Sequence, residues 1–278
     1  SKPKEVKKTP SQEFEDKMKS LASQPDEVNP LSEDASNEAS YLIYLFGEEA
    51  VAPVYSNGWA VKSKGFEDLV EKIIELTHPD VQNQALQNML PIIQGMFSSN
   101  IKAVYSIGVN KTIYLFDEMK YNNPSTFKSL ITHRFIQLLL SFSIPKLSNK
   151  NPAIHDAALK FTEWVVENDK LCLNELLRFV FQPLPSANSM ILLKSKLKIL
   201  NRIIEEHEKS VTDKLELDKL MKLILPNIES TNQDVRNAAF ELYATSYCYY
   251  GTLMEKYIKN KPQRLKNQIY SVIGLPTT

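Results

Sequence analysis

Two stretches of the chain that decide the fold are copies of each other. Residues 144–158 read IPKLSNKNPAIHDAA and residues 225–239 read LPNIESTNQDVRNAA, and they align without a gap at an offset of 226 − 145 = 81 residues. In each copy a proline bends or ends one helix, and a polar turn containing asparagine follows. A pair of alanines then lets the second helix approach its neighbour closely. The sequence therefore repeats a unit of helix, turn and helix.

The offset between the copies indicates the architecture. Half of 81 residues falls within the roughly 40–47-residue period of HEAT and armadillo units, and weaker copies of the turn occur at residues 98–104 and 186–189. Elsewhere from residue 35 onward, apolar residues recur three and four positions apart, as in helices, and no comparable stretch alternates strictly. Because single helix pairs cannot bury their apolar faces, they stack side by side. We expect an all-α protein of about twelve helices, an α-solenoid of about six HEAT-like pairs.

The chain divides by composition into two parts. Residues 1–35 are rich in lysine and proline with scattered apolar residues, which predicts a solvated leader with a short helix around residues 13–21. Residues 36–278 form the predicted repeat domain. The chain begins without methionine, so we expect it to be a piece of a longer protein and a monomer as a fragment.

Charge and composition argue against several kinds of partner. Thirty-three basic residues balance thirty-three acidic ones, which removes the global electrostatic case for nucleic acid. The apolar runs are too short to span a bilayer, so no membrane partner is expected. The two cysteines, Cys172 and Cys248, are too few for a disulfide framework and are expected as reduced intracellular thiols.

Residues that would support catalysis are widely separated in the sequence. The four histidines lie far from one another and from both cysteines, and motifs for zinc proteases, paired-cysteine sites, dinucleotides and P-loops are missing. His155 occupies the repeat position of Arg236 and is interpreted as a surface residue of the repeat. The sequence predicts no enzyme, no metal and no cofactor.

The turns within helix pairs are the candidate functional feature. In a solenoid these turns fall along one edge, so residues far apart in sequence form one binding strip. The predicted strip is positive and rich in amides, with Lys196 expected beside Lys194, and with Asp156 and Asp234 diluting the charge. Its residues are, turn by turn, Asn57, Trp59 and Lys62; Asn100 and Lys102; Lys150 and Asn151; Asn188 and Lys194; and Asn232, Arg236 and Asn237.

Trp59 is the most suggestive residue of the strip. It follows the turn sequence Tyr55-Ser56-Asn57-Gly58, where an indole can anchor a partner, and truncating such an anchor commonly costs about 2 kcal/mol or more. The alternative is that Trp59 folds back as a cap on the first helix pair. Each single lysine also has the alternative of being plain solvated surface, and Arg236 that of bridging neighbouring repeats. Trp164 lies in the middle of a predicted helix and is expected in the core.

This combination of features resembles a known family. A HEAT-like array with a tryptophan in its first turn, cations in later turns and Asn-x-Asp-Val-Arg-Asn-Ala-Ala at residues 232–239 looks like a TOG domain. Residues 45–52 (LFGEEAVA), which run into the turn before Trp59, and the blocks at 181–184 (FQPL) and 187–189 (ANS) are similar to a member of that family from the ciliary tip and centriole. The likeness covers residues 36–274.

The resemblance implies binding of the αβ-tubulin heterodimer through the turn edge, with the first turns toward β-tubulin and later turns toward α-tubulin. It also implies a place in the cytoplasm and cytoskeleton, at the cilium tip and the centriole. One departure is that Asn100 and Asn151 stand close to positions where polymerase-type TOG domains usually keep a basic residue. The alternative function is a HEAT-repeat scaffold that binds a different protein through its helical surface or its leader.

Overall fold

The structure, a computed structural model, describes residues 28–186, 189–212 and 215–274. These residues are helical and contain no strand, and they divide into two compact units with the boundary between Asn123 and Pro124. The predicted helix at residues 13–21 lies outside the described residues. The all-α prediction is confirmed, although the described residues hold more than twelve helices because several short ones separate the long ones.

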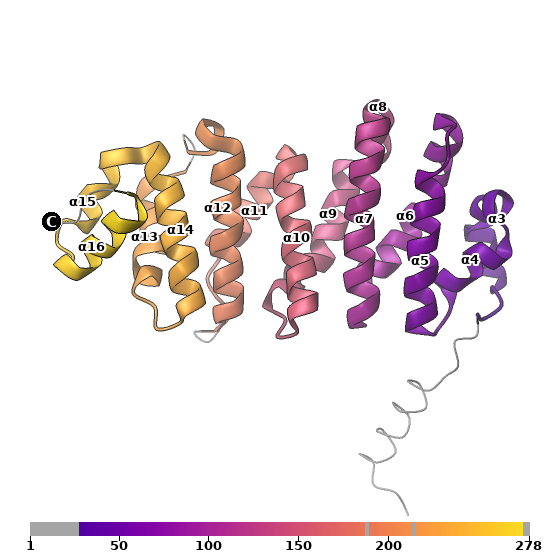
Figure 1. The fold of residues 1–278 in the computed structure, drawn as a ribbon, viewed down its shortest axis with the longest axis horizontal. Coiled ribbons are helices and arrows are strands. Elements are labelled where there is room, and N and C mark those ends of the chain that lie inside the picture. Colours follow the sequence, from indigo (N-terminus) through magenta and orange to yellow (C-terminus); the bar gives the residue numbers. More distant parts are fainter. Residues whose placement is uncertain (1–27, 187–188, 213–214, 275–278) are drawn as a thin grey trace, which may run out of the picture. The chain divides into compact units, whose positions relative to one another are not determined.

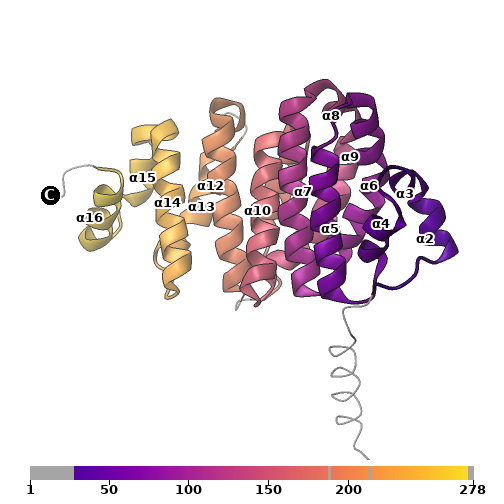
Figure 2. The same ribbon diagram turned by 45° about the vertical axis from the view of Figure 1, so that its right-hand side comes forward.

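Unit 1 ends at Asn123 and contains helices α2 to α7. The bounds are α2 (Glu33–Glu38), α3 (Ser40–Phe46), α4 (Glu48–Tyr55), α5 (Trp59–Ile74), α6 (Pro79–Ser98) and α7 (Lys102–Asn122). Helices α4 and α5 form one pair, α6 and α7 form the next, and α5 packs beside α7 (Figures 1 and 2). Helix α2 begins inside the predicted leader, where Ser32 caps its N-terminus.

Two glycines allow the close packing in unit 1. A Cβ atom on Gly65 of α5 would lie 2.4 Å from Cβ of Pro53 in α4, and one on Gly108 of α7 would lie 2.5 Å from Cβ of Met96 in α6. Both distances are shorter than the non-bonded contacts that Cβ atoms make in real proteins. The helices of each pair therefore touch at a point where only glycine fits.

Unit 2 begins at Pro124 and repeats the arrangement of unit 1. Its elements are α8 (Pro124–Leu130), α9 (His133–Ser143), η1 (Ile144–Ser148), α10 (Pro152–Asn168), η2 (Lys170–Cys172), α11 (Leu173–Phe181), α12 (Met190–Thr212), α13 (Leu217–Ile228), α14 (Gln233–Tyr250), η3 (Gly251–Met254), α15 (Glu255–Ile258) and α16 (Gln263–Val272). Helix α12 packs between α10 and α14, so these three form one layer, while α9, α11 and α13 form the layer behind it (Figure 1).

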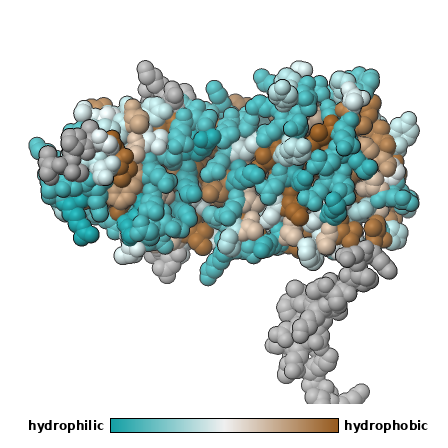
Figure 3. Space-filling model, in the orientation of Figure 1, coloured by the Kyte–Doolittle hydropathy of each residue, from teal (hydrophilic) through white to brown (hydrophobic). Residues whose placement is uncertain are grey.

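The core of unit 2 follows the predicted apolar periodicity. The apolar residues that recur three and four positions apart in α12, α13 and α14 are buried. Trp164 of α10 is 6% exposed and stacks on Phe161, as expected for a core residue. Over α10 and α12 the outward face is mostly hydrophilic (Figure 3). Burial of one side of each helix against its neighbours explains why the stacked pairs hold together.

Candidate functional site

Four turns within helix pairs share one local structure. They are residues 56–58, 99–101, 149–151 and 230–232. In each, the first residue donates its backbone N–H to the carbonyl three residues earlier, at 3.0–3.3 Å. Its side-chain oxygen then accepts from the N–H two residues later, at 2.8–3.4 Å. The third residue is the N-cap of the following long helix, with φ between −79° and −68° and ψ between 115° and 120°.

This shared turn explains the repeat that the sequence shows. Ser or Asn is needed at its first position because the side chain must accept a backbone hydrogen bond two residues on. The second position points outward and is exposed in every copy, where it is Asn57, Asn100, Lys150 or Thr231. Thr231 was not predicted as an edge residue, because nothing in its type distinguishes it from other surface threonines.

The turn edge of unit 1 consists of residues 56–62 and 99–102. Its two turns lie at the same end of α5 and α7, which pack side by side (Figures 1 and 2). Trp59 is the first residue of α5, and 49% of its side chain is exposed. Asn57, Asn100 and Lys102 are exposed as well. Trp59 is therefore accessible to a partner, as one of the two sequence interpretations requires.

Ile101 is an edge residue that the sequence analysis missed. It is the N-cap of α7 and 49% exposed, and its side chain makes no capping hydrogen bond. At the same position of unit 2, Asn151 and Asn232 accept from the backbone N–H groups of Ala153 and Val235, both at 3.1 Å. Isoleucine is a poor N-cap. An exposed apolar residue that breaks a local rule was the signal that could have identified it.

Lys62 occupies a different environment from the other cations of unit 1. It lies one turn into α5 and is half-buried, and this burial lowers the pKa of its ammonium group. Lys102, in contrast, is exposed and has no hydrogen-bond or ion-pair partner among the described residues. Of these two predicted cations, Lys102 is the one fully available to an acidic partner.

The turn edge of unit 2 consists of residues 149–156, 190–194 and 230–237. A groove of about 350 Å³ runs along it and brings together three predicted residues, Lys150, Lys194 and Asn232. The same groove is lined by Asp156 and Asp234. Asn188 lies outside the described residues. Residues 38 or more positions apart thus meet at this edge, and two acids dilute its charge.

Several predicted residues of unit 2 are already engaged within the protein. Lys194 donates to Asp234 Oδ2 at 2.7 Å, joining α12 to α14. Arg236 donates to the carbonyls of Ser230 at 2.7 Å and Thr231 at 3.0 Å, so it holds its own turn closed. This intra-turn role differs from the bridge between neighbouring repeats that the sequence left open for Arg236.

The remaining predicted residues of this edge have clear roles as well. Asn151 and Asn232 are the helix caps described above, and the exposed Asn237 accepts a hydrogen bond from Gln233 at 2.7 Å. Lys150, in contrast, is exposed and has no hydrogen-bond or ion-pair partner within the described residues. The free positive charge of the edge is therefore smaller than the sequence alone predicts.

Two sequence interpretations near this edge are wrong. Lys196 is 2% exposed, donates to the carbonyl of Gln182 at 2.6 Å and lies over the ring of Phe179, because its position on α12 points into the unit. His155 is 8% exposed rather than a surface residue. Its ring joins Asp156 at 2.8 Å and Ser195 at 2.9 Å.

The Asp156, His155 and Ser195 contacts do not form a nucleophilic site. Ser195 is completely buried and lies 3.3 Å from the carbonyl of Leu147 and 3.0 Å from that of Ile191, to which it donates. A nucleophile must reach substrate, and this hydroxyl cannot. The hydrogen bonds of this cluster join α10 to α12 next to the turn edge of unit 2.

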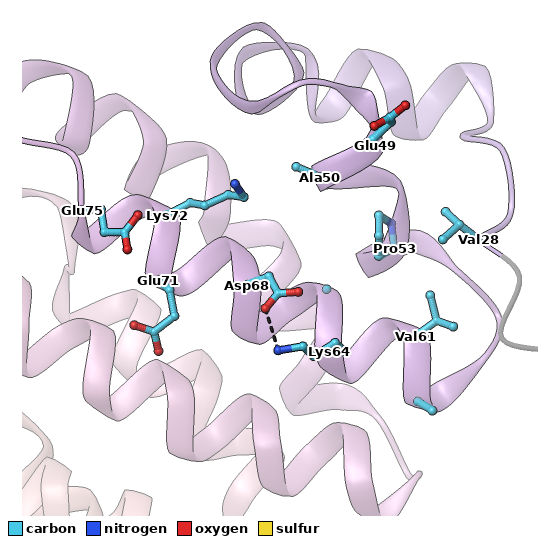
Figure 4. Close-up of a pocket in the computed structure, with 12 residues that line it drawn as sticks. Val28, Glu49, Ala50, Pro53, Val61, Lys64, Asp68, Glu71, Lys72 and Glu75 are labelled. Atoms are coloured by element: carbon cyan, nitrogen blue, oxygen red, sulfur yellow. Dashed lines mark ion pairs between the residues drawn. The ribbon is translucent and has the colours of Figure 1, made fainter.

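A second groove lies between α4 and α5 and runs from Ala60 and Val61, just after the first turn, along α5 to Glu75. It has a volume of about 780 Å³ and is open to solvent (Figure 4). Two of its carboxylates are paired, Asp68 with Lys64 at 2.8 Å and Glu71 with Lys111 at 2.8 Å. These two carboxylates are therefore held by lysines rather than poised as a general acid or base.

Three potential metal ligands meet at the other end of unit 2. His133, Asp169 and Cys172 place their ligand atoms within 4.8 Å of one another. His133 and Cys172 are 39 residues apart in the sequence, so their spacing gave no sign that they meet. Burial and the carboxylate of Asp169 raise the pKa of the Cys172 thiol.

Among the described helices, none is both long enough and apolar enough to cross a membrane.

Comparisons with known proteins agree with this fold. No protein-family model matches the chain. The mouse centrosomal protein of 104 kDa is 22% identical over 251 residues, which are 89% of this chain and 27% of that protein. The chain thus spans about a quarter of the length of this relative.

Solved structures show the same similarity. The TOG domain of human Cep104 is 18% identical with a TM-score of 0.52, over 89% of this chain and 96% of that one. A structure from work on tubulin recruitment and assembly by microtubule polymerases with TOG domain arrays is 15% identical with a TM-score of 0.59, over 95% of this chain and 51% of that one. The predicted resemblance is confirmed, and the chain has the HEAT-like helical fold of TOG domains.

Proposed function

We propose that this chain, which has the fold of a TOG domain, is a module that binds αβ-tubulin through its intra-pair turns. The observation that carries the proposal is the half-exposed indole of Trp59, at the first position of α5 beside the second turn. Large aromatic residues that are exposed on a rigid helix end are typical anchors of protein interfaces.

The surroundings of Trp59 support binding to an acidic protein surface. Ile101 adds apolar area to the turn edge of unit 1, and Lys102 adds a free positive charge. Lys150 adds another in unit 2. Apolar contacts give affinity, whereas free lysines raise the association rate with an acidic partner and lose this effect in salt. Because Lys102 and Lys150 are the predicted cations that are both exposed and unpaired among the described residues, we expect a moderate salt dependence.

The module has no chemistry of its own and acts in microtubule regulation. Solved relatives come from work on tubulin recruitment, and the sequence relative is a centrosomal protein. We infer a place in the cytoplasm on the cytoskeleton, at the centriole and the cilium tip. The chain acts as a monomer, and its balanced charge gives no reason to include nucleic acid or membrane among the partners.

Gel filtration with purified tubulin, at low and moderate salt, tests the proposal. The wild-type chain is expected to co-elute with tubulin, and Trp59→Ala to lose co-elution. Ile101→Asn is expected to weaken binding while stabilising the turn, since asparagine is a good N-cap. The role of charge is tested with the double variant Lys102→Glu and Lys150→Glu. Arg236 is left unchanged in this test, because its side chain holds its own turn closed.

Tyr121→Ala is the matched control for Trp59→Ala. Tyr121 is an aromatic residue with 86% exposure near the far end of α7, away from the turn that precedes Lys102. It should leave co-elution and the circular dichroism spectrum unchanged. Unchanged co-elution of Trp59→Ala would refute the proposal. Loss of co-elution on removal of residues 1–27, which keeps Asn29 on the turn of Ser56 and Asn57, with silent turn variants, would favour the scaffold alternative instead.

A further inference from the structure

A compact group of three different donor atoms lies in unit 2. His133 Nδ1 is 2.9 Å from Asp169 Oδ2, Cys172 Sγ is 3.5 Å from the same nitrogen, and Cys172 Sγ is 3.4 Å from Asp169 Oδ2. Cys172 is completely buried, while the side chains of His133 and Asp169 are 30% and 14% exposed. The group is thus closed on the sulfur side and open to solvent on the imidazole side.

The backbone holds these three residues in place by helix caps. His133 is the first residue of α9, and Thr132 caps that helix by accepting from the N–H of Phe135 at 3.3 Å. Asp169 ends α10 and begins η2, where its Oδ1 accepts from the N–H of Leu171 at 2.9 Å. Cys172 is the last residue of η2. The donors are therefore positioned before any ligand arrives.

The two carboxylate oxygens of Asp169 have different partners. Because Oδ1 is used in capping, only Oδ2 faces His133 and Cys172. Asp169 is thus arranged as a monodentate ligand whose second oxygen is held by a backbone N–H. Such outer hydrogen bonds orient ligands in known metal sites.

Two of the three edges of the donor triangle have the lengths of edges in a zinc tetrahedron. Zinc bonds of about 2.3 Å to sulfur and about 2.0–2.2 Å to nitrogen and oxygen give tetrahedral edges of about 3.3–3.6 Å. The two observed edges to sulfur, 3.5 and 3.4 Å, fall in this range. The edge between His133 and Asp169 is 2.9 Å, the length of a hydrogen bond, and opens by about 0.4 Å when the metal replaces the bridging proton.

The geometry points to a zinc site in which His133 Nδ1, Asp169 Oδ2 and Cys172 Sγ bind one Zn²⁺ ion, with water as the fourth ligand. A thiolate and an imidazole favour zinc over calcium or magnesium, which take oxygen ligands.

The site is independent of the proposed tubulin-binding edge. Its residues lie at the start of α9 and the end of α10, whereas the turn of residues 149–151 lies at the opposite end of both. Helix α10 has 17 residues, which at about 1.5 Å per residue separates the two features by about 25 Å. A bound zinc ion would fix the connection between neighbouring helix pairs. The zinc assignment and the proposal of tubulin binding do not depend on each other.

Metal analysis of the full chain tests this assignment. The protein is stripped with a chelator, incubated with zinc alone and dialysed, and its metal content is measured by mass spectrometry. We expect about one zinc ion per chain and a higher melting temperature than that of the stripped protein, because the metal binds the folded state. Cobalt in place of zinc should give a thiolate-to-cobalt charge-transfer band.

Ligand variants give the decisive comparison. Cys172→Ser should abolish the cobalt–thiolate band, and both it and His133→Ala should weaken zinc binding by more than the roughly 10–100-fold that loss of an outer partner costs. His133→Ala guards against misfolding of the buried cysteine variant, since His133 is partly exposed. Cys248→Ser, at the exposed cysteine, is the matched control and should keep one zinc per chain.

Two results would overturn the assignment. One is a stripped chain that takes up no zinc, which would leave the cluster as a hydrogen-bonded junction. The other is zinc uptake that falls with Cys248→Ser but not with the His133 and Cys172 variants. Loss of tubulin co-elution in Trp59→Ala with normal zinc content would show that the two sites fail separately.

Discussion

Lys194 Nζ of α12 lies 2.7 Å from Asp234 Oδ2 of α14, so a lysine of the predicted binding strip is paired with an acid of the neighbouring helix in the same layer. The lysine side chain is 30% exposed and that of the aspartate 63%. An exposed pair of this kind leaves little net charge for a partner. Neighbouring helix pairs thus neutralise part of each other's charge at the turn edge.

Removing the acid of this pair should increase binding to tubulin. In Asp234→Asn, Lys194 keeps its place on α12 but loses its counter-charge, so the edge becomes more positive. We expect an association rate with tubulin about 2–5-fold higher at low salt, and a difference that shrinks as salt is added. Stopped-flow mixing measures the rate. The exposed Asp117→Asn serves as the control on α7, and equal rates for Asp234→Asn and wild type would contradict the prediction.

The same pair predicts a pH dependence. The hydrogen bond and charge of Lys194 lower the pKa of Asp234 below its ordinary value of 3.8. A lowered carboxyl pKa contributes stability above the unfolded value, and this contribution disappears as the pH falls through the folded value. The melting temperatures of wild type and Asp234→Asn should therefore differ at neutral pH and converge below pH 3.8. A constant difference down to strongly acid pH would argue against the pair.

The asparagines of the turns should separate into structural and exposed groups. Asn151→Ala and Asn232→Ala each remove an N-cap and should lower the free energy of unfolding by about 1 kcal/mol, within a range of about 0.5–2. Asn57→Ala and Asn100→Ala alter exposed turn positions and should change it by less than about 0.5 kcal/mol. Denaturant unfolding measures all four. Equal losses at all four sites would mean that the turns do not share the described structure.

Three glycine-to-alanine substitutions should differ in sign. Gly65→Ala and Gly108→Ala drive a methyl group into Pro53 and Met96, so each should lower the free energy of unfolding by about 1–3 kcal/mol. Gly95→Ala in α6 meets no atom within 4 Å and should raise it by about 0.5–1 kcal/mol, since alanine favours a helix. Thermal melts compare the variants, and a stabilised Gly65→Ala would refute the close contact of α4 with α5.

The two cysteines should differ in reactivity. Cys248 is exposed, whereas Cys172 is completely buried and its thiol pKa is raised by burial and by the carboxylate of Asp169. Only the thiolate reacts with iodoacetamide. In metal-free native protein at neutral pH we expect about one alkylated cysteine per chain, and two after unfolding, as counted by mass spectrometry. Cys248→Ser should then show no rapid labelling, and rapid labelling of Cys172 would mean that η2 opens easily.

Local chemistry made much of the fold predictable. The polar, asparagine-containing turns that the repeated motif predicts between helices coincide with helix starts at Asn151 and Asn232. Asparagine before an apolar period at these positions is a helix-start signal, which depends on the adjacent backbone only. The burial of Trp164 followed in the same way from helical spacing.

The candidate site was only partly predictable. The exposure of Trp59 was left between two alternatives, and Ile101 was not considered because an isoleucine is normally expected inside. Lys196 was placed at the edge beside Lys194, although it lies two residues further along α12, where its side chain points into the unit and donates to the carbonyl of Gln182. A helix rotates by about 100° per residue, so a small error in register moves a side chain from surface to core.

What the sequence by itself determined is the repeated helix–turn–helix unit, since capping and apolar periodicity act over a few residues. Only the tertiary structure decided which edge charges remain free, because Lys194 and Asp234 are 40 residues apart and meet through the packing of α12 on α14. The same holds for His133 and Cys172, 39 residues apart. Contacts between repeats depend on how whole helices stack, and that depends on the volumes and shapes of all their buried side chains together.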